Sequence, residues 1–490
     1  MDISNIIEKK LLKKRLNESD FLCVINGYLN DEVSETQMVG FLKAITDNNL
    51  NNSEIYALTK AMQNAGGGKT LDLKGRVADK HSTGGVSDST TLLVVPIVAA
   101  AGVKILKMSG KSLGFTGGTA DKILCFERIK NDIPTQEALR ILNKTNGCFL
   151  TQSDEIAPAD KKIYALRDKI GLIASIPLIA SSIVSKKLAS GGHIIVFDVK
   201  VGQGAFIKTL RDAVSLAKIM IDIVKKEGKK ACAVISSMDE PLGNFIGDCL
   251  EVREAIEILK NAIKPLNPEH RQSSNSQSLK YASSSFRMIN VSTLVSNLKE
   301  EISKSNNGDK NGNNLLSLSE TLAALIIKFA QNIELEDARK QVRKVLGNGK
   351  ALTKLKEIIR EQGGSLNLFN KKIDYINKEI SLDEKGYIKN LDTENLGLIT
   401  KEFTEKYKDF AGIEILVRRG DKVSPNIILA RLYFKKDEID KTKISKKLIK
   451  KETETKQKML NEIIKRYKEC FKISPKKTKA KSNIIRKIIY

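Results

Sequence analysis

The sequence has few cysteines, and they form no recognisable pattern. There is no CxxC pair and no regular spacing, which a zinc cluster or a disulfide framework would need. We therefore expect a chain that folds without covalent cross-links in a reducing cytoplasm. The six scattered positions are Cys23, Cys125, Cys148, Cys232, Cys249 and Cys470.

Long hydrophobic runs are also missing. The first fifteen residues carry charges where a secretory peptide needs an apolar stretch. No later segment offers the roughly 20 uninterrupted apolar residues of a membrane-spanning helix. The sequence predicts a soluble, cytoplasmic protein that does not contact a membrane.

The common nucleotide-binding motifs are incomplete. Two Gly-Lys-Ser/Thr segments, at residues 68–70 and 110–112, lack the first glycine of a Walker loop, because Gln63 and Ile105 stand there. A Gly-Gln-Gly segment lacks the third glycine of a dinucleotide fingerprint, since Ile207 replaces it. These spacings disfavour a nucleoside-triphosphate enzyme or one that uses NAD.

Positive charge is abundant but unevenly placed. The formal net charge is +25, and residues 435–490 carry 20 Lys and Arg against 7 Asp and Glu. About half of the excess therefore lies in a terminal ninth of the chain. This placement favours a solvated basic tail over a nucleic-acid site.

A chain of 490 residues is long enough for two or three domains. Its apolar patterns predict a small helical domain, a large α/β domain with a mainly parallel sheet, and a C-terminal α+β domain. We expect these parts: 1–75, a helical domain with part of 160–190 packing on it; 76–265, the α/β domain; 266–315, a flexible insertion; 316–370, a helical continuation; 371–434, the α+β domain; and 435–490, a basic, helical tail.

Two glycine-rich loops carry the densest polar chemistry, at residues 80–85 (KHSTGG) and 109–119 (SGKSLGFTGGT). Glycines let backbone N–H groups approach a ligand, and lysine and hydroxyl side chains supply charge and directional donors. Such loops can cradle phosphate beyond the carboxyl ends of parallel strands. Clusters of this composition also form simple turns, so the loops alone leave both interpretations open.

A second polar set follows in helix-like segments between residues 157 and 190. Ser182 and Lys186 stand four residues apart, which places a hydroxyl and a cation on one helical face, and Arg167 and Lys187 lie nearby. Solvated charge beside a small-residue packing face is the alternative interpretation.

Taken in order, these segments resemble the blocks of the thymidine and pyrimidine-nucleoside phosphorylases. The matching blocks are DKHSTGGV, SG-x-x-LG-x-TGGT-x-DK, APADKKIYALRD, SIPLI, SKKLA, GGH-x-I-x-FDVKVG-x-GAF-x-K and EPLGN. The resemblance covers about residues 1–265 and, more weakly, 312–434. It implies a homodimeric glycosyltransferase (pentosyltransferase) of pyrimidine metabolism and nucleoside salvage. Such an enzyme uses inorganic phosphate and no organic cofactor.

The resemblance also implies roles for individual residues. His81, Arg167 and Lys186 would be catalytic, with His81 near the base and assisting its protonation. The pyrimidine would be held by Arg167, Ser182 and Lys186. Phosphate would be bound by Lys80, Ser82, Thr91, Lys107, Ser109 and Thr119. A potassium ion, held by some bacterial members, would lie at Ser87, Ser89, Leu242, Phe245 and Glu254.

The sequence departs from the family pattern beside the predicted phosphate site. Members usually have Gly at 87, Arg-Gly at 111–112 and His at 115, where this chain has Ser87, Lys111, Ser112 and Phe115. Lysine keeps the charge of arginine but loses its bidentate fork. We therefore expect the fold and the phosphate site to be retained, with a changed rate or substrate range.

The leading hypothesis is phosphorolysis of thymidine, deoxyuridine or uridine to a free base and a pentose 1-phosphate. The segments KMSG and Ser89-Thr90-Thr91 resemble the broad-specificity pyrimidine enzymes slightly more than the thymidine-specific ones. The alternatives are a phosphoribosyltransferase of similar fold and a degenerate, non-catalytic member that acts as a binding protein. A phosphoribosyltransferase would need a magnesium–pyrophosphate site, for which the sequence shows no matching acidic pair.

Overall fold

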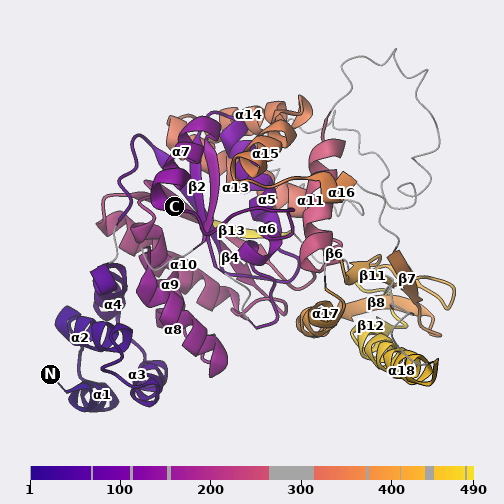
Figure 1. Cartoon of the computed structure of the whole chain (residues 1–490), viewed down its shortest axis with the longest axis horizontal. Coiled ribbons are helices and arrows are strands. Elements are labelled where there is room, and N and C mark those ends of the chain that lie inside the picture. Colours follow the sequence, from indigo (N-terminus) through magenta and orange to yellow (C-terminus); the bar gives the residue numbers. More distant parts are fainter. Residues whose placement is uncertain are drawn as a thin grey trace.

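The chain begins with a bundle of helices whose N-termini are capped by their own side chains. Capping boxes start α2, α3 and α4, with the pairs Asn17/Asp20, Ser34/Gln37 and Asn51/Glu54. Each box satisfies two backbone N–H groups that helix geometry leaves unpaired. The bundle comprises α1 (Ile3–Leu11), α2 (Glu18–Leu29), α3 (Glu35–Asn48), α4 (Asn52–Asn64) and the 3₁₀ turn η1 (Ala65–Gly67). Figure 1 shows it in indigo at one end of the molecule.

The computed structural model describes most of the chain. The described residues are 2–67, 70–110, 114–151, 156–263, 314–370, 375–408, 410–435, 446–479 and 483–490. Nearly all of the predicted insertion, 266–315, lies outside them.

Two later helices pack on the N-terminal bundle. They are α8 (Pro158–Lys169) and α9 (Ile176–Ala189). Leu166 and Ile183 from this pair share one buried apolar cluster with Phe21 and Ile55 from the bundle. The helices that carry Arg167 and Lys186 are thus held between the bundle and the sheet.

The central sheet has six strands in the order β13-β5-β4-β1-β2-β3. The first five in sequence are parallel to one another, and β13 runs antiparallel to β5. The predicted fold class, helical plus α/β with a mainly parallel sheet and a C-terminal α+β part, is confirmed. The strands are β1 (Val77–Ser82), β2 (Lys104–Ser109), β3 (Gly147–Thr151), β4 (Ile194–Val201), β5 (Lys230–Ser237) and β13 (Ile485–Ile489).

Helices cover both faces of this sheet, and strand β4 shows how the sequence supports this. Its residues read IIVFDVKV and every one is buried. Ile195 and Phe197 belong to the cluster with α9 and α10, whereas Ile194 and Val196 belong to the cluster with α5 and α13. A near-continuous apolar run is typical of a parallel strand that is covered on both sides.

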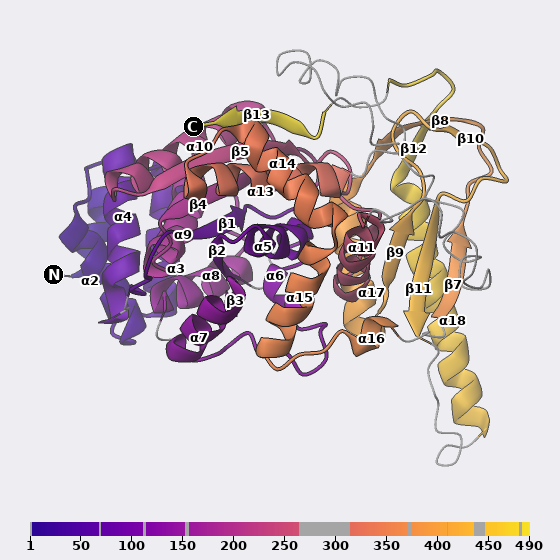
Figure 2. The ribbon, with the colours of Figure 1, turned by 90° about the horizontal axis from the view of Figure 1, so that it is seen from above.

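Helix α5 (Thr90–Ala100) is the buried centre of one layer. Its first ten residues are buried, which fits a helix that is apolar on every side. The other helices of this domain are α6 (Thr119–Ile123), α7 (Thr135–Thr145), α10 (Leu210–Lys226), α11 (Asp248–Asn261), α13 (Asn314–Gln331), α14 (Leu335–Gly347) and α15 (Lys350–Glu361). Figure 2 shows α5 between the strands and α15.

The C-terminal part contains two antiparallel sheets. One has the order β6-β9-β11-β7 and the other the order β10-β8-β12. The strands are β6 (Phe245–Ile246), β7 (Tyr375–Ile380), β8 (Gly386–Leu391), β9 (Gly412–Ile415), β10 (Lys422–Val423), β11 (Ala430–Lys435) and β12 (Phe471–Ser474). The accompanying helices are α16 (Asn367–Asn370), α17 (Thr393–Tyr407) and α18 (Lys446–Glu469).

The basic tail differs from the expected solvated extension. It contains the expected helix, α18, but Tyr467 in that helix is fully buried and its hydroxyl lies 2.8 Å from Thr400 Oγ1. Strand β12 then pairs with β8, and β13 pairs with β5 at the edge of the central sheet. Figure 2 shows β13 beside β5, away from α18. The tail is therefore integrated into two sheets.

The cysteines also differ from expectation, because Cys125 and Cys249 form a disulfide across 124 residues of sequence. Cys23, Cys148, Cys232 and Cys470 are not part of a disulfide. In the described part of the chain, no helix has the length and apolar character needed to cross a membrane.

Candidate active site

Polar side chains gather where the central parallel strands end. Strand β1 ends at Ser82 and the neighbouring β2 ends at Ser109. The carboxyl ends of parallel neighbours meet at one edge of a sheet, which is where α/β folds bind ligands. The two glycine-rich loops of the sequence start at this edge.

Lys80 is fully buried at this edge. Its Nζ donates to Thr90 Oγ1 at 2.6 Å and lies 3.4 Å from Asp198 Oδ2. Asp198, on β4, also pairs with Lys200 at 2.8 Å. Burial of an ammonium group costs less when a carboxylate and a hydroxyl pair with it, and Asp198 and Thr90 are these partners of Lys80.

Asp88 connects the first glycine-rich loop to helix α6, which follows the second. It accepts hydrogen bonds from Ser82 Oγ and from Thr90 Oγ1, and its carbonyl accepts from Lys122 Nζ at 2.9 Å. Burial raises the pKa of Asp88, but the ammonium groups of Lys200, Lys80 and Lys122 outweigh it and lower the pKa overall. Asp88 is thus a carboxylate that fixes the Ser82 hydroxyl.

The remaining predicted phosphate residues line the same region. Thr91 is buried in the first turn of α5, and Thr119 is the first residue of α6. Lys107 Nζ donates to Ser109 Oγ at 2.9 Å and to the Met108 carbonyl at 2.8 Å. Burial lowers the pKa of Lys107 well below 10.5, and the nearby charge of Lys187 lowers it further.

His81 lies between the sheet edge and helix α9. Burial of its ring lowers its pKa well below 6.5, and the ammonium groups of Lys187, Lys107 and Lys186 lower it further. Its Nδ1 has no hydrogen-bond partner among the described residues. The imidazole is therefore neutral near neutral pH, with one ring nitrogen available.

A second cluster joins helices α8 and α9. Lys186 Nζ lies 2.5 Å from Asp160 Oδ2 and 3.1 Å from Ser182 Oγ, and Ser182 Oγ donates to Asp160 Oδ1 at 2.5 Å. Burial lowers the pKa of Lys186, while Asp160 raises it, with a net lowering. The predicted pairing of Ser182 and Lys186 on one face is present, and Asp160 on α8 holds both groups.

Arg167 is buried, and its guanidinium holds the connection between α8 and α9. It donates from Nε to the Leu172 carbonyl, from Nη2 to Ile173 and from Nη1 to Leu178, at 2.9, 3.0 and 3.1 Å. Burial lowers its pKa to about 10, and Asp160 counteracts this. Three of its five N–H donors are thus used within its own segment.

Lys187 ties the second cluster to the sheet. Its Nζ donates to Asp79 Oδ2 on β1 and to the Met108 carbonyl on β2, both at 2.7 Å. Because Lys186 and Lys187 are consecutive, this contact places the α8–α9 cluster next to the sheet edge. His81 lies close enough to both groups to feel their charge.

The predicted potassium residues also come together, around Gly243. A Cβ added at Gly243 would lie 2.3 Å from Glu254 Oε2 and 2.7 Å from Ser87 Oγ, so these oxygens lie on the same side of the backbone. Ser87 Oγ donates to the Phe245 carbonyl at 2.5 Å, and Glu254 accepts from the Asn244 N–H at 2.8 Å. Burial raises the pKa of Glu254 to about 7.

Of the other two residues of that set, Leu242 directly precedes Gly243, and Ser89 is the residue before α5. The Leu242 N–H donates to the Val86 carbonyl at 3.2 Å. Ser89 Oγ is buried with no hydrogen-bond partner in the described part of the chain. Oxygen ligands of this kind suit a hard cation.

Comparison with known proteins identifies the family. Residues 74–315 match the family described as "Glycosyl transferase family, a/b domain", and residues 4–66 match its "helical bundle domain". A pyrimidine-nucleoside phosphorylase of Bacillus subtilis is 34% identical over 90% of this chain and 94% of that protein. One of Geobacillus stearothermophilus is 35% identical over the same shares, and one of Staphylococcus epidermidis is 37% identical over 81% and 82%. The chain belongs to this glycosyltransferase family.

A solved member of the same fold is anthranilate phosphoribosyltransferase from Thermus thermophilus. The two structures align with a TM-score of 0.51 and 15% sequence identity. The alignment covers 73% of this chain and 99% of the phosphoribosyltransferase chain. At this identity the likeness concerns the fold alone.

The departures from the family pattern fall in two groups. Lys111 and Ser112 lie outside the described residues. Phe115 is buried, its ring lies 5.0 Å from that of Phe206, and Lys208 Nζ lies 5.3 Å from its centroid. The loop around it is held by Lys401 of α17, which donates to the Gly114 carbonyl at 3.0 Å.

Sequence reasoning missed the carboxylates of this family member's site. Asp79, Asp88, Asp160 and Asp198 each hold a lysine or a hydroxyl that the sequence had singled out. The available signal for Asp79, Asp160 and Asp198 was their position inside the quoted blocks, such as the first residue of DKHSTGGV. Asp88 lies outside those blocks.

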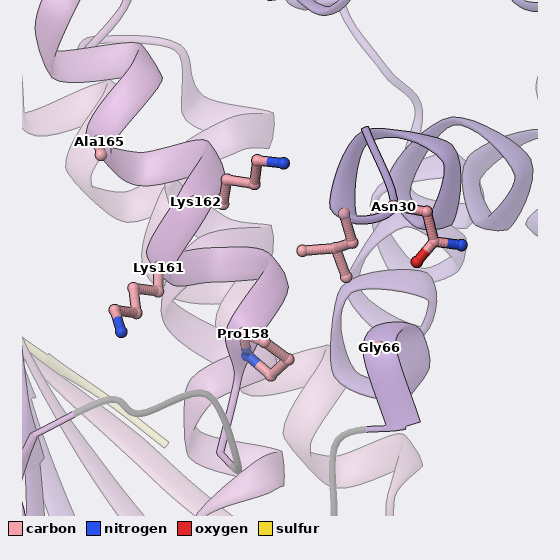
Figure 3. Close-up of a pocket in the computed structure, with 7 residues that line it drawn as sticks. Asn30, Gly66, Pro158, Lys161, Lys162 and Ala165 are labelled. Atoms are coloured by element: carbon pink, nitrogen blue, oxygen red, sulfur yellow. The ribbon is translucent and has the colours of Figure 1, made fainter. Parts of the chain in front are cut away.

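A pocket of about 570 Å³ lies elsewhere, between α8 and α2. Figure 3 shows Pro158, Lys161, Lys162 and Ala165 on one side and Asn30 and Gly66 on the other. Lys162 crosses toward α2, where its Nζ donates to the Tyr28 carbonyl and to Asp31, both at 2.6 Å. None of the predicted site residues lines this pocket, so it belongs to the packing of α8 on the bundle.

Proposed function

We propose that this protein catalyses the phosphorolysis of pyrimidine nucleosides. It would convert thymidine, deoxyuridine or uridine, with inorganic phosphate, into a free base and a pentose 1-phosphate. The observation that carries the proposal is that two clusters of basic residues lie near His81. One is at the sheet edge, with Lys80 and Lys107, and the other is on α8 and α9, with Arg167 and Lys186. The names of the relatives, all pyrimidine-nucleoside phosphorylases, support the same reaction.

The sheet-edge cluster would bind the nucleophile. We assign phosphate to the Nζ atoms of Lys80 and Lys107, and to the hydroxyls of Ser82, Ser109, Thr91 and Thr119. Ser82 donates its one hydroxyl hydrogen to Asp88, so the hydroxyl would turn from Asp88 to a phosphate oxygen when phosphate binds. Phosphate then attacks the anomeric carbon from the face opposite the base, and holding both reactants in line lowers the entropic part of the barrier.

The α8–α9 cluster would bind the leaving pyrimidine. Positive character grows on the sugar and negative charge grows on the base as the glycosidic bond breaks. Lys186 and the two remaining N–H groups of Arg167 would stabilise that charge as an oxyanion hole does, with each lost donor costing about 3 kcal/mol. Ser182 would join them when its hydroxyl turns from Asp160 to the base. Asp160 holds Lys186 and Ser182 in place.

His81 would hydrogen-bond the base as a neutral imidazole. Its lowered pKa argues against a resident imidazolium as the proton source in the free enzyme. A neutral ring can still pass a proton from one nitrogen while it accepts one at the other.

Potassium would fit the oxygens around Gly243. Ser87 and Glu254 converge there, and the buried Ser89 hydroxyl has no other hydrogen-bond partner among the described residues. When bound, the ion would supply positive charge that attracts these oxygens. It would thereby fix the segment between β5 and α11 beside Ser87, which follows the first glycine-rich loop.

A spectrophotometric assay tests the reaction. Purified protein should release thymine or uracil from thymidine or uridine only when phosphate is present. Release that is indifferent to phosphate would refute phosphorolysis. If no pyrimidine nucleoside reacts, the non-catalytic binding role is favoured instead, and turnover with a phosphoribosyl pyrophosphate and a base would favour the phosphoribosyltransferase.

We also propose a homodimer, as the family resemblance implies, with a cytoplasmic location. Light scattering coupled to size-exclusion chromatography measures the first directly. A mass of one chain at micromolar concentration would contradict the dimer.

A further inference from the structure

The disulfide between Cys125 and Cys249 lies close to the helix α6, which directly follows the second glycine-rich loop (residues 109–119). Cys125 lies two residues after the end of α6, and Cys249 is in the first turn of α11. Their Cα atoms are 5.4 Å apart, within the range that a disulfide spans without backbone movement. Cys125 is partly exposed and the adjacent Leu124 is 53% exposed, so solvent-borne reagents can reach the bond.

The bond joins a very short helix to a long one. Helix α6 has five residues and α11 has fourteen. A single helical turn is not stable by itself, so α6 depends on its neighbours for position. Its first residue is Thr119, which we assign to phosphate.

A buried network of charged and polar groups runs from α6 and α11 to Ser82 in the first glycine-rich loop (residues 80–85). Lys122 of α6 contacts Glu251 of α11 at 2.8 Å and donates to the Asp88 carbonyl at 2.9 Å. Asp88 in turn fixes Ser82. Cys125 lies three residues after Lys122, and Cys249 lies two residues before Glu251. The disulfide therefore cross-links α6 and α11 beside the Lys122–Glu251 ion pair, at the end of this network that is farther from Ser82.

We propose that the Cys125–Cys249 bond is a reversible redox link that sets the affinity of the site for phosphate. The inference rests on the phosphate site proposed above. With the bond formed, α6 is fixed against α11, and this holds Thr119 and Lys122 of α6 at a constant position relative to Ser82. With the bond reduced, α6 is held by the Lys122–Glu251 ion pair and apolar packing, and phosphate binding must order it.

The exchange partners are small-molecule thiols and disulfides such as glutathione. In oxidation, the Cys125 thiolate attacks the small disulfide, forms a mixed disulfide and releases one thiolate. The Cys249 thiolate then attacks Cys125 Sγ, which closes the bond and releases the second thiolate. Two electrons pass to the small disulfide, and the two protons of the cysteines end on the two released thiols.

The full-length protein can be tested in glutathione buffers of graded potential. After acid quenching and alkylation, peptide masses report the fraction of Cys125 and Cys249 that is reduced, and calorimetry with orthophosphate reports the dissociation constant. We expect one two-electron transition and a dissociation constant about fivefold or more higher in the reduced protein, typical of coupling between sites. Equal affinity in both states, or two thiols that stay alkylatable in every buffer, would overturn the proposal.

Variants separate the link from general effects of oxidation. Cys125→Ser and Cys249→Ser should each bind phosphate like the reduced protein in all buffers. Cys23→Ser, which removes a partly exposed cysteine in the bundle, should keep the full redox response. Thermal unfolding of each variant checks that it is folded. The comparison of the oxidised with the reduced wild-type protein tests the link without any substitution.

Failure of the link and failure of the proposed function give different results. Without phosphorolysis, base release is absent while the thiol titration and the orthophosphate titration can still be read. Without the link, base release is normal and the phosphate affinity does not respond to redox potential.

Discussion

Lys186 and Lys187 are neighbours in sequence, but their ammonium groups are held by carboxylates on different elements. Lys186 pairs with Asp160 on α8 at 2.5 Å, and Lys187 pairs with Asp79 on β1 at 2.7 Å. One turn of α9 therefore connects the helical bundle side of the site to the sheet. Each carboxylate can be removed separately, which makes the two halves of the site accessible to experiment.

Asp160→Asn should impair catalysis through Lys186. The carboxylate raises the pKa of Lys186 against the lowering by burial, so its removal lets that pKa fall further. Lys186 then loses its charge at a lower pH. We expect kcat/KM to fall about 100-fold, and its alkaline limb to move to lower pH. The pH dependence of base release measures both.

The control for this substitution is Asp222→Asn, at an exposed aspartate on α10. It should leave the profile unchanged. A folded Asp160→Asn protein with the wild-type alkaline limb would show that Asp160 does not act through Lys186.

Arg167→Ala should reduce both turnover and stability. It removes a proposed donor to the base, which costs about 100- to 1,000-fold in kcat. It also leaves the partly buried carbonyls of Leu172 and Ile173 and the buried carbonyl of Leu178 without their donors. We expect the free energy of unfolding to fall by about 2 kcal/mol or more. Assays of base release and denaturant unfolding measure the two effects.

Arg211→Ala, at an exposed arginine on α10, is the matched control and should change neither quantity. Unchanged turnover in Arg167→Ala would remove this residue from the base site, whatever its stability.

Potassium should stabilise the protein in a pH-dependent way. The pKa of Glu254 is raised to about 7, so the group is mostly protonated at pH 6 and mostly charged at pH 8. A cation is therefore attracted more strongly at pH 8. At ten times its dissociation constant at pH 8, potassium should add about 1.4 kcal/mol at pH 8, and the same concentration should add less at pH 6.

Thermal unfolding in potassium chloride and in tetramethylammonium chloride at equal ionic strength measures this difference. Glu254→Gln should abolish the pH dependence of the potassium effect. Equal melting temperatures in both salts at pH 8 would argue against a cation at this position.

The fold and the cationic residues could be predicted from sequence, because glycine spacing, apolar periodicity and family blocks are local patterns. The roles of the cationic residues stay predictions until they are tested. Their carboxylate partners could not be predicted, because an aspartate such as Asp160 in a helical segment is typically solvated. Only the packing of α8 on α9 makes it a buried partner.

Contacts between distant segments could not be predicted from the sequence either, because they too depend on how helices and strands pack in the folded chain. Cys125 and Cys249 have no diagnostic spacing, since α6 and α11 meet only in the folded chain. Ile485–Ile489 is a short apolar run in a lysine-rich tail, and its composition does not reveal that it pairs with β5.

Truncation after Lys435 should destabilise the protein, contrary to the expectation for a dispensable tail. It removes β12 and β13 together with Tyr467, whose burial completes the packing of α17. Loss of β13 also exposes β5 as an unprotected sheet edge, which favours aggregation. A milder truncation after Lys479 removes β13 alone and should lower the melting temperature less. Thermal unfolding and solubility after expression would measure this order, and wild-type values for the longer truncation would show that the tail contributes nothing to the fold.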